Sequence, residues 1–391
     1  MFPGSSHPDD LTQPLIIPHS SFNPAPGYSS LMPTASPSVL KKAVPRRVGG
    51  LVLLVLLAGI WTVFEIQAQR TGLAKPLAVY KDPDHRLFPN DAKAETNSDG
   101  LRCALEAEAI PEESTTVFFA GDSFVFGVEV AREDALPSLF EQGLREAIET
   151  EKINVVNAGW PSASPLLALR LLRDVGIRYR PDLVVYGFDM SDFRDDLMYR
   201  NLIEKKGIYR MIDVMPASLW LAGRGAKAVA PDGLYERIFR MPKDRFFPVN
   251  QPLSQTRADF MPVWQTLMEI DLFCREQLNA DFRLVVLPRN FQYSDLESPS
   301  SWERGQYEDL GPFVLEPFRF FEEQAATAAF PIHSLLPAFQ ETDIFPTCYT
   351  GDPHWTPAGT QVAADALVEM AVTQGWLATP DTTQRPASKE K

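Results

Sequence analysis

Short apolar runs alternate with amphipathic stretches over most of the chain beyond the first hundred or so residues. The runs at residues 117–120, 153–157, 183–187 and 284–287 are bounded by polar residues, which predicts buried strands. Between and after them, the spacing of apolar residues predicts helices at 135–148, 165–175, 260–278 and 356–373. This alternation is typical of an α/β fold with a central parallel sheet, whose right-handed crossover helices cover both of its faces.

A long apolar run near the N-terminus predicts a membrane anchor. Residues 48–64 carry no charge, so we predict one transmembrane helix at 48–65. More basic residues precede the run than follow it: Lys41, Lys42, Arg46 and Arg47 before it, Arg70 and Lys75 after it. The positive-inside rule then places the N-terminus in the cytoplasm and the main domain outside the cell membrane, in a periplasmic or extracytoplasmic location. A cleaved signal peptide and a buried core helix are the alternatives, but no A-x-A site follows and no polar face interrupts the run.

The rest of the chain divides by composition. Residues 1–47 hold nine prolines with little apolar periodicity and are predicted to be a disordered cytoplasmic tail. A linker and approach segment is predicted at 66–110, a folded domain at 111–378 and a polar tail at 379–391. Within the domain, residues 199–256 fit the alternation poorly, and we interpret them as an insertion that forms a lid or cap over a site.

Charge and cysteine content exclude several classes of function. The net charge of −14 on 391 residues argues against a nucleic-acid partner, which needs a basic face. The three cysteines, Cys103, Cys274 and Cys348, form no Cys-x-x-Cys pair, which excludes a thiolate zinc site and a disulfide framework. One disulfide with a leftover thiol stays open as an alternative.

Polar residues follow three of the predicted strands where each strand ends. Ser123 follows the first in GDSF, Asn157-Ala158-Gly159 follows the second, and Ser191-Asp192 comes shortly after the third. Ligands of doubly wound sheets bind at the carboxyl ends of the strands, so these residues should converge. The Gly-Asp-Ser sequence alone could be an ordinary turn, but the convergence favours an exposed nucleophilic serine.

A serine nucleophile needs a base and a group that orients the base. The chain has five histidines, of which His7 and His19 lie in the predicted tail, His85 in the approach segment, and His333 in an apolar stretch that suggests a structural role. His354 stands just before a predicted helix, with Asp352 two residues earlier in GDPHW. This pair is the best candidate for a base and its orienting carboxylate, while a capped turn with a plain loop histidine is the structural alternative.

Taken together, these motifs resemble the SGNH (GDSL-type) hydrolases. The resemblance rests on GDSF at residues 121–124, NAG at 157–159 and DPH at 352–354, in this order, and on TNSDGLR at 96–102 upstream. It implies a flavodoxin-like three-layer α/β/α SGNH-hydrolase fold over about residues 90–375. It also implies a cofactor-free mechanism with Ser123 as nucleophile, His354 as general base and Asp352 as its orienting group. The implied oxyanion hole consists of the Ser123 and Gly159 N–H groups and of Ser191, which stands where the family places an Asn.

The Asp-x-His-Trp spacing departs from the usual Asp-x-x-His of the family. It resembles that of the alginate O-acetylation proteins, although in those the Asp-His pair precedes the serine. Trp160 and Trp355 follow the implied oxyanion glycine and the base, and they could stack on a sugar ring or simply pack the loops. The acidic residues between Asp189 and Asp196 match no calcium loop, so we interpret them as a solvated or helix-capping stretch and predict no metal site.

The sequence therefore predicts a membrane-anchored serine esterase that acts on acyl esters, acetyl esters first, of a small molecule or a polysaccharide. Two alternatives remain. One is a polysaccharide O-acetyltransferase that hands the acyl group from Ser123 to a glycan hydroxyl, and the other is a catalytically weak binding module of the same fold.

Overall fold

The computed structural model describes residues 46–70, 89–204, 215–219, 221, 244–304 and 311–377. Several predicted features lie outside these ranges. They are the tail at 1–47 as far as residue 45, the polar tail at 379–391, most of the insertion 199–256, and His7, His19 and His85. The chain forms two compact units, one made of residues 1–78 and 214–235 and the other of residues 79–213 and 236–391. Each unit is described by itself below.

In the larger unit a five-stranded parallel sheet has the order β2-β1-β3-β4-β5. Its strands are β1 (Thr115–Gly121), β2 (Ile153–Gly159), β3 (Leu183–Phe188), β4 (Asp281–Val286) and β5 (Ile332–Ser334). The first four confirm the predicted strands. The sequence pattern missed β5 because it has only three residues and little apolar character, and it brings His333 into the sheet.

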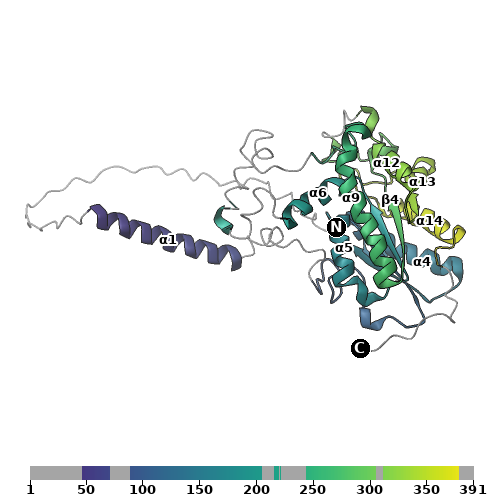
Figure 1. Cartoon of the computed structure of the whole chain (residues 1–391), viewed down its shortest axis with the longest axis horizontal. Coiled ribbons are helices and arrows are strands. Elements are labelled where there is room, and N and C mark those ends of the chain that lie inside the picture. The colour runs from purple at the N-terminus through teal and green to yellow at the C-terminus, as the bar shows by residue number, and fades with distance from the viewer. Residues whose placement is uncertain are drawn as a thin grey trace, which may run out of the picture. The chain divides into compact units, whose positions relative to one another are not determined.

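Helices connect the strands and cover both faces of the sheet (Figure 1). Four of them confirm predictions: α4 (Leu136–Ile148), α5 (Pro165–Asp174), α9 (Leu253–Phe273), which continues as a π-helix over Cys274–Leu278, and α14 (Pro357–Thr373). The others are α3 (Ser123–Phe126), α6 (Asp192–Ile203), α10 (Asn290–Tyr293), α12 (Glu316–Ala325) and α13 (Leu336–Glu341). Single 3₁₀ turns lie at Ala107–Ala109, Arg132–Asp134, Gly176–Tyr179 and Gly311–Phe313.

Alternation along the strands divides the core into two layers. In β1, Val117 and Phe119 pack with Phe140 of α4 and the apolar face of α14, whereas Phe118 and Ala120 pack toward α5 and α9. Successive side chains of a strand point to opposite faces, so a strand that is apolar throughout requires cover on both sides. The predicted α/β architecture with a central parallel sheet is therefore confirmed, with α4, α13 and α14 on one face and α5, α6, α9 and α12 on the other (Figure 1).

Three glycines lie side by side at the carboxyl edge of the sheet. Gly121 of β1 pairs with Gly159 of β2 and with Gly187 of β3. A methyl group added to Gly159 would lie 2.2 Å from the Phe126 nitrogen, and one added to Gly121 or Gly187 would lie 2.4 or 2.6 Å from Val125 Cγ2. The row of glycines therefore lets the short helix α3 sit directly on the ends of the strands.

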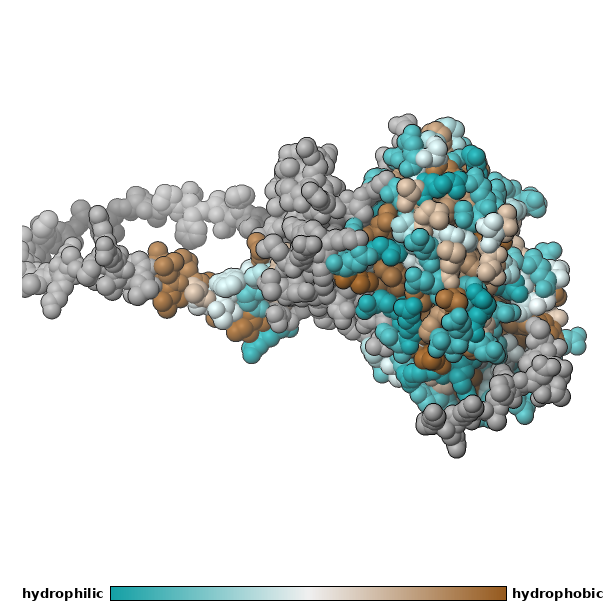
Figure 2. All heavy atoms as spheres, in the orientation of Figure 1, coloured by the Kyte–Doolittle hydropathy of each residue, from teal (hydrophilic) through white to brown (hydrophobic). Residues whose placement is uncertain are grey.

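In the smaller unit, α1 (Arg46–Arg70) is helical throughout the predicted span 48–65. Apolar side chains lie exposed along it, with Leu54 65% and Ile60 67% exposed, and they appear as brown patches in Figure 2. Trp61 donates a hydrogen bond of 2.7 Å to Ser218 Oγ, and the Glu65 carboxylate accepts from the backbone N–H groups of Ala217 and Ser218.

Within the described residues, no helix reaches the combined length and hydropathy of a membrane-crossing segment.

The close approach of α3 to β2 predicts that Gly159→Ala is destabilising. The added methyl group meets backbone rather than a movable side chain, so helix and strand must separate. We expect a loss of roughly 1–3 kcal/mol in the free energy of unfolding, measured by urea denaturation. Gly351→Ala is the matched control, because nothing lies within 4 Å of the position of its added methyl group. Equal stability of the two variants would contradict this account.

Candidate active site

The predicted nucleophile lies at the junction between β1 and α3. Asp122 follows the last residue of the strand and caps the helix, because its carboxylate accepts a 2.9 Å hydrogen bond from the Phe124 N–H. Ser123 is then the first helical residue, and its side chain stands at the carboxyl edge of the sheet. The first N–H groups of a helix have no partner within the helix, so the Ser123 N–H is left free by the hydrogen bonding of α3.

The structure brings the three predicted catalytic residues together. Ser123 Oγ lies 2.9 Å from His354 Nε2, and His354 Nδ1 is hydrogen-bonded to Asp352 Oδ1. Ser123 and His354 are 7% and 5% exposed, so their contact is largely shielded from water. A carboxylate at Nδ1 favours the tautomer with the proton on Nδ1, which leaves Nε2 to accept the serine proton.

The two-residue spacing of Asp352 and His354 is compatible with this geometry. Asp352 Oδ1 accepts from the His354 ring and also, at 3.0 Å, from the His354 backbone N–H. The loop is closed by an isolated bridge between Cys348 and Trp355 and by a hydrogen bond from Ser298 Oγ to the Asp352 carbonyl. The departure from Asp-x-x-His therefore does not prevent a triad from forming.

Buried carboxylate Glu297 anchors the start of this loop. It accepts hydrogen bonds from the Thr347 N–H and hydroxyl, at 2.7 and 2.8 Å, and from the Cys348 N–H at 3.1 Å. Sequence analysis missed Glu297 because it lies in a polar stretch with no regular pattern. Cys103, Cys274 and Cys348 are all free and buried, so the alternative of a single disulfide is not realised.

Two of the predicted oxyanion donors are engaged elsewhere in the structure. The Gly159 N–H donates to Asn157 Oδ1 at 3.0 Å, and the Ser191 hydroxyl donates to Asp189 Oδ1. Of the three predicted donors, which all lie in described parts of the chain, the Ser123 N–H is the one that these bonds leave free. The assignments of Gly159 and Ser191 rested on the family resemblance, and the side-chain partners that occupy them could not be foreseen from it.

A buried ion network lies next to Ser191. The Arg289 guanidinium is 1% exposed and binds Asp189 through two hydrogen bonds of 2.7 and 2.8 Å and Glu303 through two of 2.8 Å. It also donates to Ser191 Oγ at 3.3 Å and lies 5.5 Å from the centre of the Phe124 ring. Sequence analysis missed this network, although a basic residue two positions beyond the strand predicted at 284–287 was a usable signal.

Buried charges in and around this network shift the pKa values of three aspartates in different directions. Burial alone would raise the pKa of Asp189, but the Arg289 charge and its hydrogen bonds hold that pKa below its ordinary value. Burial, together with the neighbouring Asp189, raises the pKa of Asp122 to about 7. Burial and the nearby Asp122 likewise raise the pKa of Asp192 well above its ordinary value, which favours the neutral acid.

The acidic stretch is buried, so the expectation that it is solvated is wrong. Asp189, Asp192 and Asp196 have no exposed surface. The expectation of a capping role is partly met, since Asp196 Oδ1 accepts from the Leu166 N–H in the first turn of α5 and its Oδ2 accepts from Arg200. The sequence could not distinguish a solvated acidic face from a buried one, because Arg289, which compensates Asp189, lies 100 positions along the chain.

The two tryptophans differ in their surroundings. Trp355 is 3% exposed and packs between Phe124 and Phe339, at ring-centroid distances of 4.8 and 4.9 Å. Its ring therefore packs the loop of His354 against Phe124 and Phe339, and its predicted contact with a sugar stays a prediction. Trp160 is half-buried and lies beside Tyr199. Its backbone N–H donates to the Gly121 carbonyl. It stays a candidate for substrate contact.

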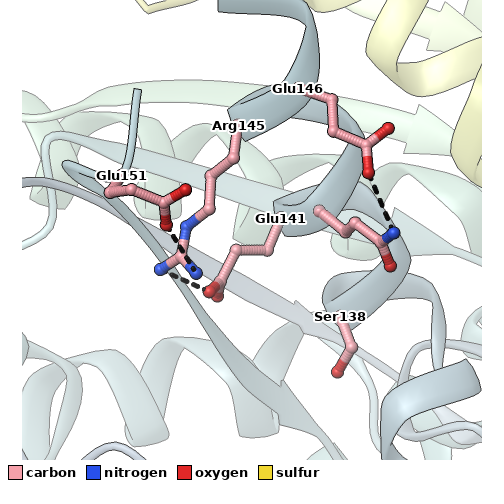
Figure 3. A pocket seen from close by; sticks show the side chains of 6 residues that line it. Ser138, Glu141, Arg145, Glu146 and Glu151 are labelled. Atoms are coloured by element: carbon pink, nitrogen blue, oxygen red, sulfur yellow. Dashed lines mark hydrogen bonds and ion pairs between the residues drawn. The ribbon is translucent and has the colours of Figure 1, made fainter. Parts of the chain in front are cut away.

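A surface pocket on α4 contains none of the predicted site residues (Figure 3). Figure 3 shows Glu141 and Glu151 turned toward Arg145, which pairs with them at 2.7 Å and 3.8 Å, whereas Glu146 accepts from Gln142. The Arg145 guanidinium also donates to the Ile153 carbonyl. These contacts join α4 to the start of β2, which gives the pocket a structural role.

The sequence matches no protein-family model and no curated protein. Among solved structures, the chain is similar to the lipase/acylhydrolase from Enterococcus faecalis, with 14% identity over 67% of this chain and 96% of that chain at a TM-score of 0.39. An acetylxylan esterase from Geobacillus stearothermophilus has 16% identity over 66% and 95%, with a TM-score of 0.37. A two-domain esterase active on acetylated mannans has 12% identity over 73% and 56%, with a TM-score of 0.39.

The buried position of Arg289 predicts that its removal is costly. Arg289→Met leaves Asp189 buried without its counter-charge and Glu303 with Arg245 alone, and we expect a loss of roughly 3–5 kcal/mol in the free energy of unfolding. Arg257→Met is the matched control, since Arg257 pairs with Glu323 on the surface and the two side chains are 41% and 43% exposed. Urea denaturation of both variants measures the difference. Similar losses would show that the buried network contributes no more to the free energy of unfolding than a surface ion pair does.

The raised pKa of Asp122 predicts a specific pH dependence of stability. With an unfolded value of 3.8 and a folded value of about 7, the native state holds a proton that the unfolded state lacks. The contribution of Asp122 to stability therefore falls as the pH rises through this window. Asp122→Asn keeps an oxygen that can accept from the Phe124 N–H but does not titrate, so the stability of the variant should rise relative to that of the parent as the pH increases. Parallel pH profiles from urea denaturation would contradict this.

Proposed function

We propose that this chain is an SGNH-type serine esterase that cleaves acyl esters through Ser123, His354 and Asp352. The observation that carries the proposal is the continuous hydrogen-bonded path from Ser123 Oγ through the His354 ring to the Asp352 carboxylate. A strand–turn–helix junction supports it, because it presents the serine at the carboxyl edge of a parallel sheet.

In the acylation step, His354 Nε2 takes the Ser123 proton while Oγ attacks the carbonyl carbon of the ester. Asp352 stabilises the imidazolium that forms. The tetrahedral intermediate then collapses, the bond to the alcohol breaks, and His354 returns the proton to the leaving alcohol. Water attacks the acyl-serine in the same way, which releases the acid and restores Ser123. No cofactor takes part in these steps.

The developing oxyanion needs hydrogen-bond donors, each of which contributes about 3 kcal/mol to lowering the barrier. The Ser123 N–H is available for this role. For Gly159 to act as a second donor, the Asn157 side chain must turn away from its N–H, and for Ser191 to act, its hydroxyl must leave Asp189. The hole is therefore expected to be completed only when substrate is bound.

We further propose that the acyl group is acetyl and that the alcohol belongs to a small molecule or a polysaccharide. Trp160 is half-buried and its backbone N–H is bonded to the last residue of β1, which places its ring at this edge and supports a flat partner such as a sugar there. The uncharged run at residues 48–64 and its basic N-terminal flank support a single-pass anchor with the catalytic domain outside the cytoplasm.

Hydrolysis of p-nitrophenyl acetate by the full chain tests the proposal. Ser123→Ala and His354→Ala should each lower kcat by about three to six orders of magnitude, because they remove the nucleophile and its base. Ser138→Ala is the control, since this serine lies in the surface pocket on α4 and should leave the rate unchanged. All variants should show the parent's circular dichroism spectrum.

A serine-reactive phosphonate and an added glycan distinguish the alternatives. Covalent labelling of Ser123 in the parent supports the nucleophile, while a folded parent without labelling or turnover indicates a binding module. Faster consumption of the acetyl donor when a glycan is added, with acetylated glycan as product, indicates a transferase instead of a hydrolase.

A further inference from the structure

The turn that follows the nucleophile helix is held in an unusual backbone conformation. α3 is a single helical turn, and Gly127 ends it with a φ of 84°. Glu129, two residues later, has a φ of 66°, which is uncommon for a residue with a side chain. One turn of helix has little stability of its own, so the position of Ser123 depends on what holds this segment, residues 126–130, in place.

Arg102 holds the segment from one side. Its guanidinium donates to the carbonyls of Phe126 at 2.8 Å, Gly127 at 2.7 Å and Val130 at 2.9 Å. Arg102 is 6% exposed, and its guanidinium lies 4.5 Å from the centre of the Phe126 ring. It thus binds the carbonyl groups that the end of the helix leaves without partners.

The segment TNSDGLR, residues 96–102, presents this arginine. Asn97 Oδ1 accepts from the N–H groups of Asp99 and Leu101, and Asn97 Nδ2 donates to the Leu105 carbonyl and to Tyr179 OH. These bonds fold the segment into a tight loop with Arg102 at its end. The motif is therefore explained by what it does to the nucleophile helix, although it contributes no catalytic group.

Tyr349 holds the same segment from the loop that carries the base. Its hydroxyl donates to the Glu129 carbonyl at 2.8 Å. Within its own loop, the Tyr349 N–H donates to the His354 carbonyl at 3.1 Å, and the Tyr349 carbonyl accepts from the Asp352 N–H at 3.4 Å. One phenol therefore links the turn after Ser123 to the turn that carries Asp352 and His354.

We propose that Arg102 and Tyr349 are positioning residues that together set the alignment of Ser123 with His354. This rests on the proposed esterase function. Ser123 and His354 are separated by 231 positions in the chain. Besides their own hydrogen bond, an apolar contact connects their segments, because the Phe124 ring packs against the rings of His354 and Trp355. Apolar contact is non-directional, whereas the bond from Tyr349 to Glu129 has a defined direction and length.

The Tyr349 bond lies at an exposed site, so it should contribute to alignment more than to stability. Tyr349→Phe removes its hydroxyl alone and should lower kcat for p-nitrophenyl acetate by about 10-fold or more, with KM nearly unchanged, because misalignment slows the chemical step. Arg102→Lys keeps the charge but loses the forked donor and should act in the same direction. The double variant should lose less than the product of the two effects, since both act on one turn.

Ser114→Ala is the matched control. It removes a buried hydroxyl just before the N-terminal end of β1, which donates to the Pro111 carbonyl at 2.7 Å and accepts from Asn154 Nδ2 at 2.8 Å, and it leaves both contacts to residues 126–130 in place. We expect a lower melting temperature with the parent's kcat. A kcat for Tyr349→Phe equal to that of the parent would overturn the proposal.

Hydrogen–deuterium exchange tests the link without relying on turnover. In Tyr349→Phe, peptides that cover residues 121–130 and 348–355 should both exchange faster than in the parent, because the bond joins them. If the parent shows neither turnover nor phosphonate labelling, the esterase function fails, and exchange alone decides on the link. Unchanged exchange in both peptides would overturn the link even in an active enzyme.

Discussion

The close contact between a single helical turn and the ends of three strands is the constraint on which the rest of the site depends. Gly121, Gly159 and Gly187 stand in register across β2, β1 and β3, and side chains at these positions would collide with Val125 or Phe126 of α3. Because α3 rests directly on the sheet, Ser123 stands at a defined height above the strand ends. The loop with Asp352 and His354 then needs only to reach that point.

A buried network of charges lies beside this contact, with the Arg289 guanidinium 5.5 Å from the centre of the Phe124 ring of α3. Arg289 lies between Asp189 and Glu303, and all three are almost completely buried. Such a network is costly to desolvate, and apolar residues of the same volume could be equally stable. We therefore interpret the network as structural: it holds Ser191 and the start of α6 in one arrangement beside Ser123. Burial, followed by the neighbouring Asp189, also raises the pKa of Asp122, which lies next to Ser123.

The parts of the site are held together by residues that take no part in the chemistry. Glu297 fixes the start of the base loop, Arg102 fixes the end of α3, and Tyr349 connects the two. The hydrogen bond between Ser123 and His354 is therefore supported by several anchors that act on the same two segments. An active site built in this way can keep its geometry even though its residues come from loops, because each loop is bonded at more than one point.

Local pattern in the sequence determined the four longer strands and four of the helices that cover them, and it singled out Ser123, His354 and Asp352 as candidates. Apolar periodicity and the positions of polar residues after strands are properties of neighbouring residues. Only the tertiary structure decided which hydrogen-bond donors are free, that the Trp355 ring packs against Phe124 and Phe339, and that the acidic stretch is buried. The partners that settle these questions lie far away in the chain, as Arg289 does from Asp189, 100 positions earlier. Whether a side chain is bonded to such a partner cannot be predicted from the residues around it, because the bond depends on where the fold brings the two together.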